Sequence, residues 1–259
     1  MMVEPSAIEK NARLALSLMD LTRLNDNDSE NDVRALCARA AGPAGSVAAV
    51  CIWPRFAALA RGLLLKDIGV ATVVNFPHGG TDVAQAMEET LAAVQAGAQE
   101  IDVVLPYRAL GGGRVAEVRA VLDAVRAACP DQILKVIIEV GELGSPELIA
   151  AASDLSIDAG ANFLKTSTGK TPVSATPETA RIMLERIAAR GNAAARVGFK
   201  VSGGVRTLDD AMIYLQLQAK ILGTNSLIRE RFRIGASALL DNLEAVLGLD
   251  AASSHTSGY

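Results

Sequence analysis

The stretch VATVVNFPHGGTDVAQAMEETLAAVQAGAQEIDVVLP, residues 70–106, contains one strand–helix–strand unit. Its two ends are strand-length apolar runs rich in valine. Residues 82–96, between the two runs, place apolar side chains at helical spacing, which predicts a helix that packs one face against a sheet. The side chains expected on that face are Val83, Met87, Leu91 and Val94.

Runs of the same kind recur along the whole chain, with segments of helical spacing between them. Eight strands alternating with helices predict an α/β protein, a (β/α)8 TIM barrel, as a single domain over residues 1–259 with a short polar C-terminal tail at about 250–259. The rival is a doubly wound open sheet, but such sheets usually have fewer strands, and no glycine-rich dinucleotide turn follows the first run. The eight runs are LMDLT (18–22), VAAVCIW (47–53), VATVVNF (70–76), EIDVVLP (100–106), ILKVIIEV (133–140), NFLKTS (162–167), RVGFKVSG (196–203) and RFRIGAS (231–237).

Helix-start signals support this alternation. Ser145 and Thr176 each precede a proline, which favours a capping residue followed by proline in the first helical turn. Residues 207–210, TLDD, resemble a capping box with aspartate in place of glutamate. A leucine-rich stripe that starts at Leu239 predicts a last helix ending before Gly248.

Composition excludes several classes of protein. Half of the 259 residues are hydrophobic and 21% are charged, so the chain is not disordered. The formal net charge of −4 argues against nucleic acid or an anionic membrane as a partner. We expect a cytoplasmic protein with reduced thiols, because Cys37, Cys51 and Cys129 have neither disulfide-like nor metal-like spacing and no signal peptide or membrane span is evident.

The strand faces direct an unusual set of charges into the barrel. Successive strand residues alternate between two faces, and in each strand one face is uniformly apolar. If the apolar faces meet the helices, charged side chains point inward, and burying them costs several kcal/mol unless they are paired. The residues predicted to point inward are Asp20, Cys51, Asp102, Lys135, Glu139, Lys165 and Lys200.

Three of only seven lysines thus meet in one interior, in a chain that has 18 arginines. An ion-pair lattice is the structural explanation, but arginines would serve a lattice equally well. A neutral, nucleophilic amine requires lysine, since arginine does not lose its proton. We expect Lys165 and Lys200 to lie at matching depths, one as an amine that forms a Schiff base and the other as the cation that keeps it neutral.

Proton transfer is expected to fall to Asp102 and the lysines. Asp102 faces the same interior and can move protons directly or through a water molecule. Neither histidine, His78 nor His255, occupies an inward strand position, and His78 is interpreted as a loop or helix-entry residue.

A phosphate site is predicted where the last two strands end. Gly203 and Gly204 follow the seventh strand, and residues 235–237 open the final helix. Barrels commonly bind phosphate with backbone N–H groups at these two loops, although a Gly-Gly pair alone equally suits a tight turn. Lys170, just beyond the sixth strand, adds a cation to the predicted site.

The runs LMDLTRLND, EIDVVLPYRAL, FLKTSTGK, FKVSGGVRT and RFRIGAS resemble 2-deoxyribose-5-phosphate aldolase, a class I aldolase family, from about residue 14 to the end. The resemblance implies reversible cleavage of 2-deoxy-D-ribose 5-phosphate to D-glyceraldehyde 3-phosphate and acetaldehyde in deoxyribonucleotide catabolism, without a metal or organic cofactor. It also implies Lys165 as the Schiff-base lysine, with Asp102 and Lys200 transferring protons. The substrate-binding positions are then Thr168, Gly169, Lys170, Gly203, Gly204, Gly235 and Ser237, joined by Asp20 and Cys51 from the inward faces.

Three positions depart from the family pattern. Val201-Ser202 replaces a frequent Pro-Ala, and Trp53 stands where tyrosine is frequent. Ala238 follows Ser237 where a second serine is common, so one hydroxyl of the phosphate site is missing. The loss of one hydrogen bond is worth about 0.5–1.5 kcal/mol, more if the bonded group is charged.

Two alternatives stay open: a class I aldolase or transaldolase for a different or non-phosphorylated aldehyde pair, and a sugar-phosphate sensor without turnover. We expect small phosphosugar and aldehyde partners, and the sequence leaves the oligomeric state open, with a homodimer as one option. Tyr259, at the end of the tail, is a candidate proton donor to the enamine carbon, because its phenol titrates near pH 10.

Overall fold

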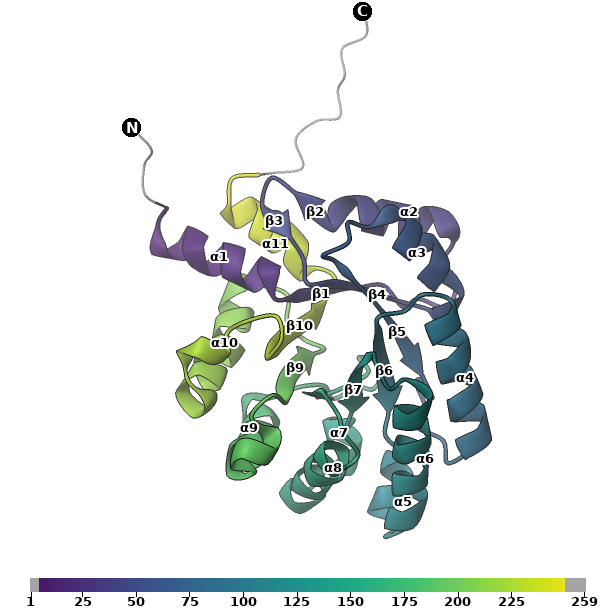
Figure 1. Ribbon diagram of the computed structural model, residues 1–259. Helices are drawn as coiled ribbons and strands as arrows, with labels where there is room; N and C mark the ends of the chain where they lie inside the picture. Colours follow the sequence, from purple (N-terminus) through teal and green to yellow (C-terminus); the bar gives the residue numbers. More distant parts are fainter. Residues whose placement is uncertain (1–4, 250–259) are drawn as a thin grey trace, which may run out of the picture.

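Eight parallel strands close into a barrel in the computed structural model, which describes residues 5–249 (Figure 1). Around the barrel the strands follow the order β1–β10–β9–β8–β7–β6–β5–β4, and β1 closes it by pairing with β4. All eight apolar runs are strands, so the predicted (β/α)8 barrel is confirmed. The barrel strands are β1 (Met19–Thr22), β4 (Ala49–Ile52), β5 (Gly69–Val74), β6 (Glu100–Val104), β7 (Ile133–Ile137), β8 (Phe163–Lys165), β9 (Gly198–Ser202) and β10 (Phe232–Ala236).

Helices surround the strands as an outer layer (Figure 1). Within the described residues no helix is long and apolar enough to cross a membrane. Short 3-10 turns, η1 (Pro54–Phe56), η2 (Gly191–Ala194) and η3 (Thr224–Ser226), lie in the connections. The α-helices are α1 (Ala7–Ser17), α2 (Glu30–Arg39), α3 (Ala57–Leu63), α4 (Val83–Gln95), α5 (Tyr107–Gly111), α6 (Val115–Ala128), α7 (Val140–Leu143), α8 (Pro146–Asp158), α9 (Pro177–Ala189), α10 (Leu208–Leu222) and α11 (Leu239–Val246).

The predicted caps begin three of these helices. The side chains of Ser145 and Thr176 accept hydrogen bonds from the first turns of α8 and α9, each of which has proline at its start. Thr207 and Asp210 form a reciprocal capping box on α10. The last helix ends as predicted, with Gly248 in the left-handed region at φ 67°.

The face of α4 that packs against the sheet differs from the prediction. Met87 and Leu91 are both 42% exposed, whereas Ala86, Thr90 and Ala93 are buried. Small side chains let this helix lie close to the strands, and hydrophobicity alone had favoured the larger residues. The helix was therefore predicted correctly; Val83 and Val94 pack against the core as predicted, and the prediction was wrong for Met87 and Leu91.

A second, two-stranded sheet was not predicted. Strands β2 (Ala41–Gly42) and β3 (Gly45–Ser46) pair antiparallel around a tight turn. Arg13 of α1 donates a hydrogen bond of 2.8 Å to the carbonyl of Ala44 and ties this hairpin to the first helix. Two-residue strands carry no alternation of polar and apolar residues from which they could be recognised.

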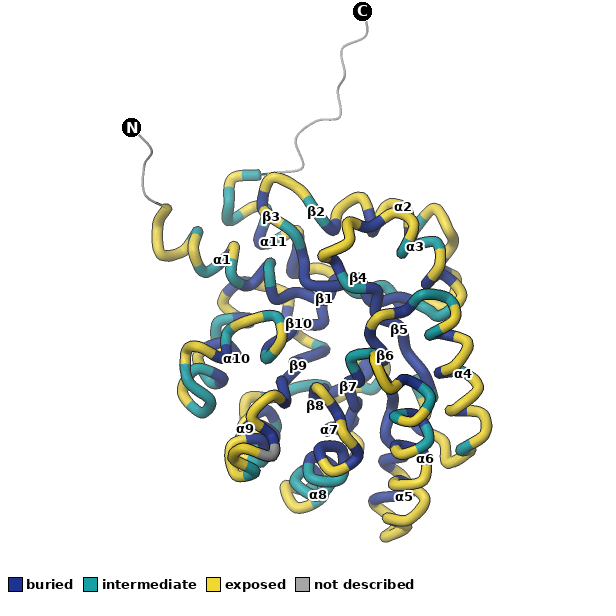
Figure 2. The backbone as a smooth tube through the Cα atoms, in the orientation of Figure 1, coloured by how far each residue is buried: buried dark blue, intermediate teal, exposed yellow. Residues whose placement is uncertain are grey.

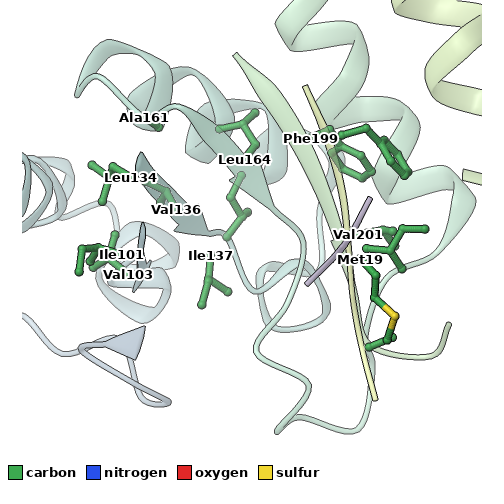
Figure 3. Close-up of a cluster of buried hydrophobic side chains, with 14 of the residues drawn as sticks. Met19, Ile101, Val103, Leu134, Val136, Ile137, Ala161, Leu164, Phe199 and Val201 are labelled. Carbon is green, nitrogen blue, oxygen red and sulfur yellow. The ribbon is translucent and has the colours of Figure 1, made fainter. Parts of the chain in front are cut away.

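The apolar strand faces meet the helices as predicted. Side chains such as Val103, Val136 and Leu164 are fully buried in the layer between strands and helices, where Figure 3 shows them with Met19 and Phe199. In Figure 2 the barrel strands are buried and the outer faces of the helices are exposed. The opposite strand faces, which carry the charged residues, therefore line the barrel interior.

Candidate active site

Three lysines meet one carboxylate inside the barrel. Lys165 and Lys200 are direct neighbours in the register of β8 and β9. Both Nζ atoms lie 2.8 Å from Oδ2 of Asp102, and Lys135 Nζ lies 2.7 Å from its Oδ1. Lys165 is 2% exposed, and the other three side chains are fully buried. The predicted convergence and the matching depth of Lys165 and Lys200 are both present.

A second layer of charges supports this cluster. Asp20 accepts from Lys200 at 2.5 Å and from Arg233 at 2.6 Å. Arg233 also donates to Glu100 at 2.9 Å, and Glu100 lies 2.5 Å from Lys135. The ion-pair lattice considered from the sequence therefore exists.

The charges in the interior shift the pKa values of the three lysines in different directions. Burial lowers the pKa of Lys165, and nearby Lys200 lowers it further, together outweighing the attraction of Asp102. Burial also disfavours the charge on Lys200, but Asp102 and Asp20 raise its pKa well above the usual value. Lys135 shifts upward too, because Asp102 and Glu100 outweigh the effect of burial on its pKa. Of the three lysines, Lys165 is the one most readily neutral.

The interior carboxylates are held in their ionised form. Burial opposes ionisation of Asp102, but the ammonium groups of Lys135 and Lys165 outweigh it and bring the pKa well below the usual range. Burial acts in the same way on Asp20, and Lys200 and Arg233 lower its pKa despite it. Each carboxylate therefore carries a fixed negative charge at neutral pH.

Cys51 lies against the same cluster. Its Sγ is 4.0 Å from Oδ2 of Asp102, and the residue is fully buried. Burial raises the pKa of this thiol, so it is uncharged at neutral pH. Cys51 and Asp20 do not line the cavity described next, and their predicted role in substrate binding stays a prediction.

A cavity of about 590 Å³ opens at the carboxyl ends of the strands next to this cluster. Ser202 and Gly235 line it, and a Cβ on Gly235 would lie 3.1 Å from Cε of Lys200, so the lysine passes directly beneath the cavity wall. Seven of the predicted substrate-binding residues line this cavity. They are Thr168, Gly169, Lys170, Gly203, Gly204, Gly235 and Ser237.

The Gly-Gly pair forms a tight turn and also borders the cavity. Gly203 and Gly204 have φ values of 87° and 85°, in the region that favours glycine. A Cβ on Gly203 would collide with the side chain of Ser174. Across the cavity, Ser237 and Ala238 precede α11, whose first turn has no side-chain cap.

The loop after β8 is anchored by a buried carboxylate that the sequence placed inward without assigning it a role. Glu139 adopts a left-handed conformation at φ 57° and accepts a 2.5 Å hydrogen bond from Thr168 Oγ1. Thr171 Oγ1 donates to the same carboxylate at 3.2 Å. Lys170, in this loop, donates to the carbonyl of Leu24 at 2.6 Å across the cavity. Glu139 thus fixes the segment that carries the cavity's lysine.

A family model for DeoC/LacD family aldolases matches residues 14–245. The chain belongs to this family. Its barrel is therefore that of an aldolase family.

Solved structures agree with this assignment. A candidate deoxyribose-phosphate aldolase from Coccidioides immitis is 30% identical over 92% of this chain and 87% of its own, with a TM-score of 0.76. A second candidate deoxyribose-phosphate aldolase, from Toxoplasma gondii ME49, has a TM-score of 0.85 at 25% identity, over 93% of this chain and 98% of its own. The deoxyribose phosphate aldolase from Aeropyrum pernix, which is tetrameric, has a TM-score of 0.71 at 25% identity over 95% of this chain and 100% of its own.

Several residues of this DeoC/LacD aldolase's site were not found from the sequence. Arg23, Arg39 and Arg206 line the cavity. Arg23 is paired with Asp28 and Asp32, and Arg39 is paired with Asp241 and Glu244. These arginines lie in loops or at a helix end, where no strand alternation marks them. Arg233 had a usable signal, because it alternates with Phe232 and Ile234 in the eighth run and therefore points inward.

Two predictions concern residues outside the interior. His78 is an exposed loop residue, as expected, whose carbonyl accepts a hydrogen bond from Arg108. Tyr259 and the polar tail at 250–259 lie outside the described residues, and their predicted roles stay predictions.

Proposed function

We propose that this protein is a class I aldolase that reversibly cleaves 2-deoxy-D-ribose 5-phosphate to D-glyceraldehyde 3-phosphate and acetaldehyde. The observation that carries the proposal is the position of Lys165, a buried lysine with a lowered pKa beside Lys200, next to a cavity that has features of a phosphate site. Three unpaired thiols, Cys37, Cys51 and Cys129, favour a cytoplasmic location.

The reaction begins with attack of the neutral Lys165 amine on the C1 aldehyde of the open-chain sugar. The carbinolamine loses water and leaves a protonated imine, which is an electron sink. The C3 hydroxyl gives up its proton as the C2–C3 bond breaks, and the bonding electrons move toward the imine nitrogen to form an enamine. Glyceraldehyde 3-phosphate leaves, C2 takes up a proton, and water hydrolyses the second imine to release acetaldehyde.

Asp102 and Lys200 assist these proton transfers. Oδ2 of Asp102 lies 2.8 Å from Nζ of Lys165 and 2.8 Å from Nζ of Lys200, so it connects the two lysines. Because the pKa of Asp102 is strongly lowered, the carboxylate stays ionised and holds a transferred proton only briefly. Its negative charge also stabilises the protonated imine.

The phosphate group is assigned to the glycine-lined end of the cavity. Two turns, at Gly203-Gly204 and at residues 235–238, line the cavity there, and Lys170 and Arg206 supply positive charge. Thr168 and Gly169 complete the wall on the side of β8.

The test is reduction with borohydride in the presence of acetaldehyde, followed by peptide mass mapping. A reduced two-carbon adduct on the peptide that contains Lys165 is expected. An adduct on Lys200 or Lys135 instead would reverse the assignment, and the absence of any adduct would remove the Schiff-base mechanism. Adduct formation without turnover of the phosphosugar would favour the sugar-phosphate sensor.

One observation favours a second candidate, an aldolase for a non-phosphorylated aldehyde pair. Ala238 stands at the start of α11 without a side-chain hydrogen bond, so this turn offers the phosphate one hydroxyl fewer. Cleavage of deoxyribose with and without its 5-phosphate separates the two candidates. A much higher kcat/KM for the phosphate ester supports the first.

A further inference from the structure

Six buried charged groups form a closed ring of alternating sign in the barrel interior. Every member pairs with an opposite charge on each side, and all six are almost fully buried. The successive pairs are Lys200–Asp102 (2.8 Å), Asp102–Lys135 (2.7 Å), Lys135–Glu100 (2.5 Å), Glu100–Arg233 (2.9 Å), Arg233–Asp20 (2.6 Å) and Asp20–Lys200 (2.5 Å).

The ring contains three carboxylates and three cations, so its formal charge is zero without Lys165. Lys165 is attached from outside by one ion pair, to an Asp102 oxygen that already accepts from Lys200. An ammonium group at Lys165 gives the assembly a net charge of +1, whereas an amine leaves it neutral. Because an uncompensated buried charge is costly, the count favours the amine.

Other groups near Lys165 are not members of the ring. Cys51, on β4, is an uncharged thiol. Glu139, after β7, has its carboxylate bound by Thr168 and Thr171, and within residues 5–249 it makes no ion pair with a lysine or arginine. The remaining charged groups that face Lys165, from β1, β6, β7 and β9, are ring members.

We propose that Glu100 and Arg233 are positioning residues of this aldolase, which complete the ring and keep it neutral so that Lys165 is the one interior lysine without a proton. The proposal rests on the proposed Schiff-base function. Glu100 is enclosed by Lys135 and Arg233, and Arg233 by Glu100 and Asp20, so neither side chain is expected to touch substrate. They act on Lys165 through the charge balance alone.

The charge balance of the ring predicts that substitutions of Arg233 and Glu100, which contact each other, shift the deprotonation of Lys165 in opposite directions. Arg233→Met leaves the ring at −1, so Lys165 keeps its proton to a higher pH. Glu100→Gln leaves the ring at +1, so Lys165 loses its proton at a lower pH. The double variant removes one charge of each sign and returns the ring to zero. A unit charge about 10 Å away, in a medium of effective dielectric about 20, shifts a titration by about one pH unit.

The experiment measures the rate of imine formation with acetaldehyde from about pH 5 to about pH 10, by borohydride trapping and mass analysis of the Lys165 peptide. The midpoint is the pH at which this rate reaches half of its maximum. We expect it to rise by about one pH unit in Arg233→Met and to fall in Glu100→Gln. The double variant should return to the parent midpoint. Arg186→Met is the matched control, because it breaks a partly exposed ion pair with Asp154 on the outer helices and should leave the midpoint unchanged.

Shifts of both single variants in the same direction, or a double variant that does not recover, would overturn the proposal. If Arg233→Met does not fold, Arg233→Lys and Glu100→Gln test the proposal instead. Arg233→Lys keeps the positive charge and should keep the parent midpoint, whereas Glu100→Gln should lower the midpoint. A parent adduct at Lys165 with unmoved midpoints refutes only the ring proposal. No parent adduct at Lys165 refutes the proposed function as well.

Discussion

Replacing Lys200 with methionine removes a positive charge beside Lys165 and keeps most of the side-chain volume. The two nitrogens both lie 2.8 Å from Asp102 Oδ2, so they can be no further apart than twice that distance. At about 5 Å and an effective dielectric of about 20, two like charges repel by about 3 kcal/mol, or about two pKa units. Lys200→Met should therefore raise the pKa of Lys165 and reduce its neutral fraction at neutral pH by up to about 100-fold.

The assay is kcat for cleavage of 2-deoxyribose 5-phosphate as a function of pH, alongside the trapping rate at Lys165. We expect both rates to fall strongly at neutral pH and the trapping rate to recover as pH rises, because deprotonation of Lys165 then limits it. Cleavage should recover less, since Lys200 also takes part in proton transfer. Lys170→Met is the matched control, because Lys170 binds the Leu24 carbonyl at the cavity and does not contact Asp102. It should weaken substrate binding and leave the pH midpoint unchanged.

Folding has to be checked separately, because the substitution breaks two buried ion pairs. Such losses cost about 3–5 kcal/mol of stability, although Asp20 keeps Arg233 and Asp102 keeps Lys135 as partners. Urea unfolding shows whether the variant is folded in the assay. A folded variant whose trapping rate has the parent pH dependence would refute the reasoning, since Lys200 would then not influence the protonation of Lys165.

Asp102→Asn should slow cleavage by about 10²- to 10⁴-fold, measured by kcat, while trapping at Lys165 persists; loss of trapping together with the fold would make Asp102 purely structural. Gly203→Ala should raise KM for the phosphorylated substrate more than it lowers kcat, because the new Cβ needs the space of Ser174 and a strained φ of 87°; an unchanged KM would remove this turn from the phosphate site. Ala238→Ser should lower the same KM by about 2- to 10-fold if its hydroxyl reaches the phosphate, and should leave cleavage of free deoxyribose unchanged. Asp20 and Asp102 have lowered pKa values in the folded protein, so their contribution to stability is present above about pH 4 and is lost as pH falls below it. Urea unfolding should show this loss, and the free energy of unfolding should depend less on pH below about pH 4 in Asp20→Asn.

The sequence by itself determined the strands, several helix starts and the direction of the charged side chains. Alternation along a strand decides which face a residue occupies, and it needs only local geometry. It therefore directed Lys135, Lys165 and Lys200 inward together with Asp102. The glycine pair after the seventh strand was also readable, because positive φ values favour glycine.

Only the tertiary structure decided which charge pairs with which. Partners across a barrel depend on strand stagger and closure, which no single strand encodes. Closure brings Asp20 of the first strand to Lys200 and Arg233 of the last two, and it places Glu100 between Arg233 and Lys135. The same long-range packing buries the alanine face of α4 and seats Glu139 under the loop after β8. Local patterns thus select the residues of the interior, and closure of the barrel determines their contacts and their protonation.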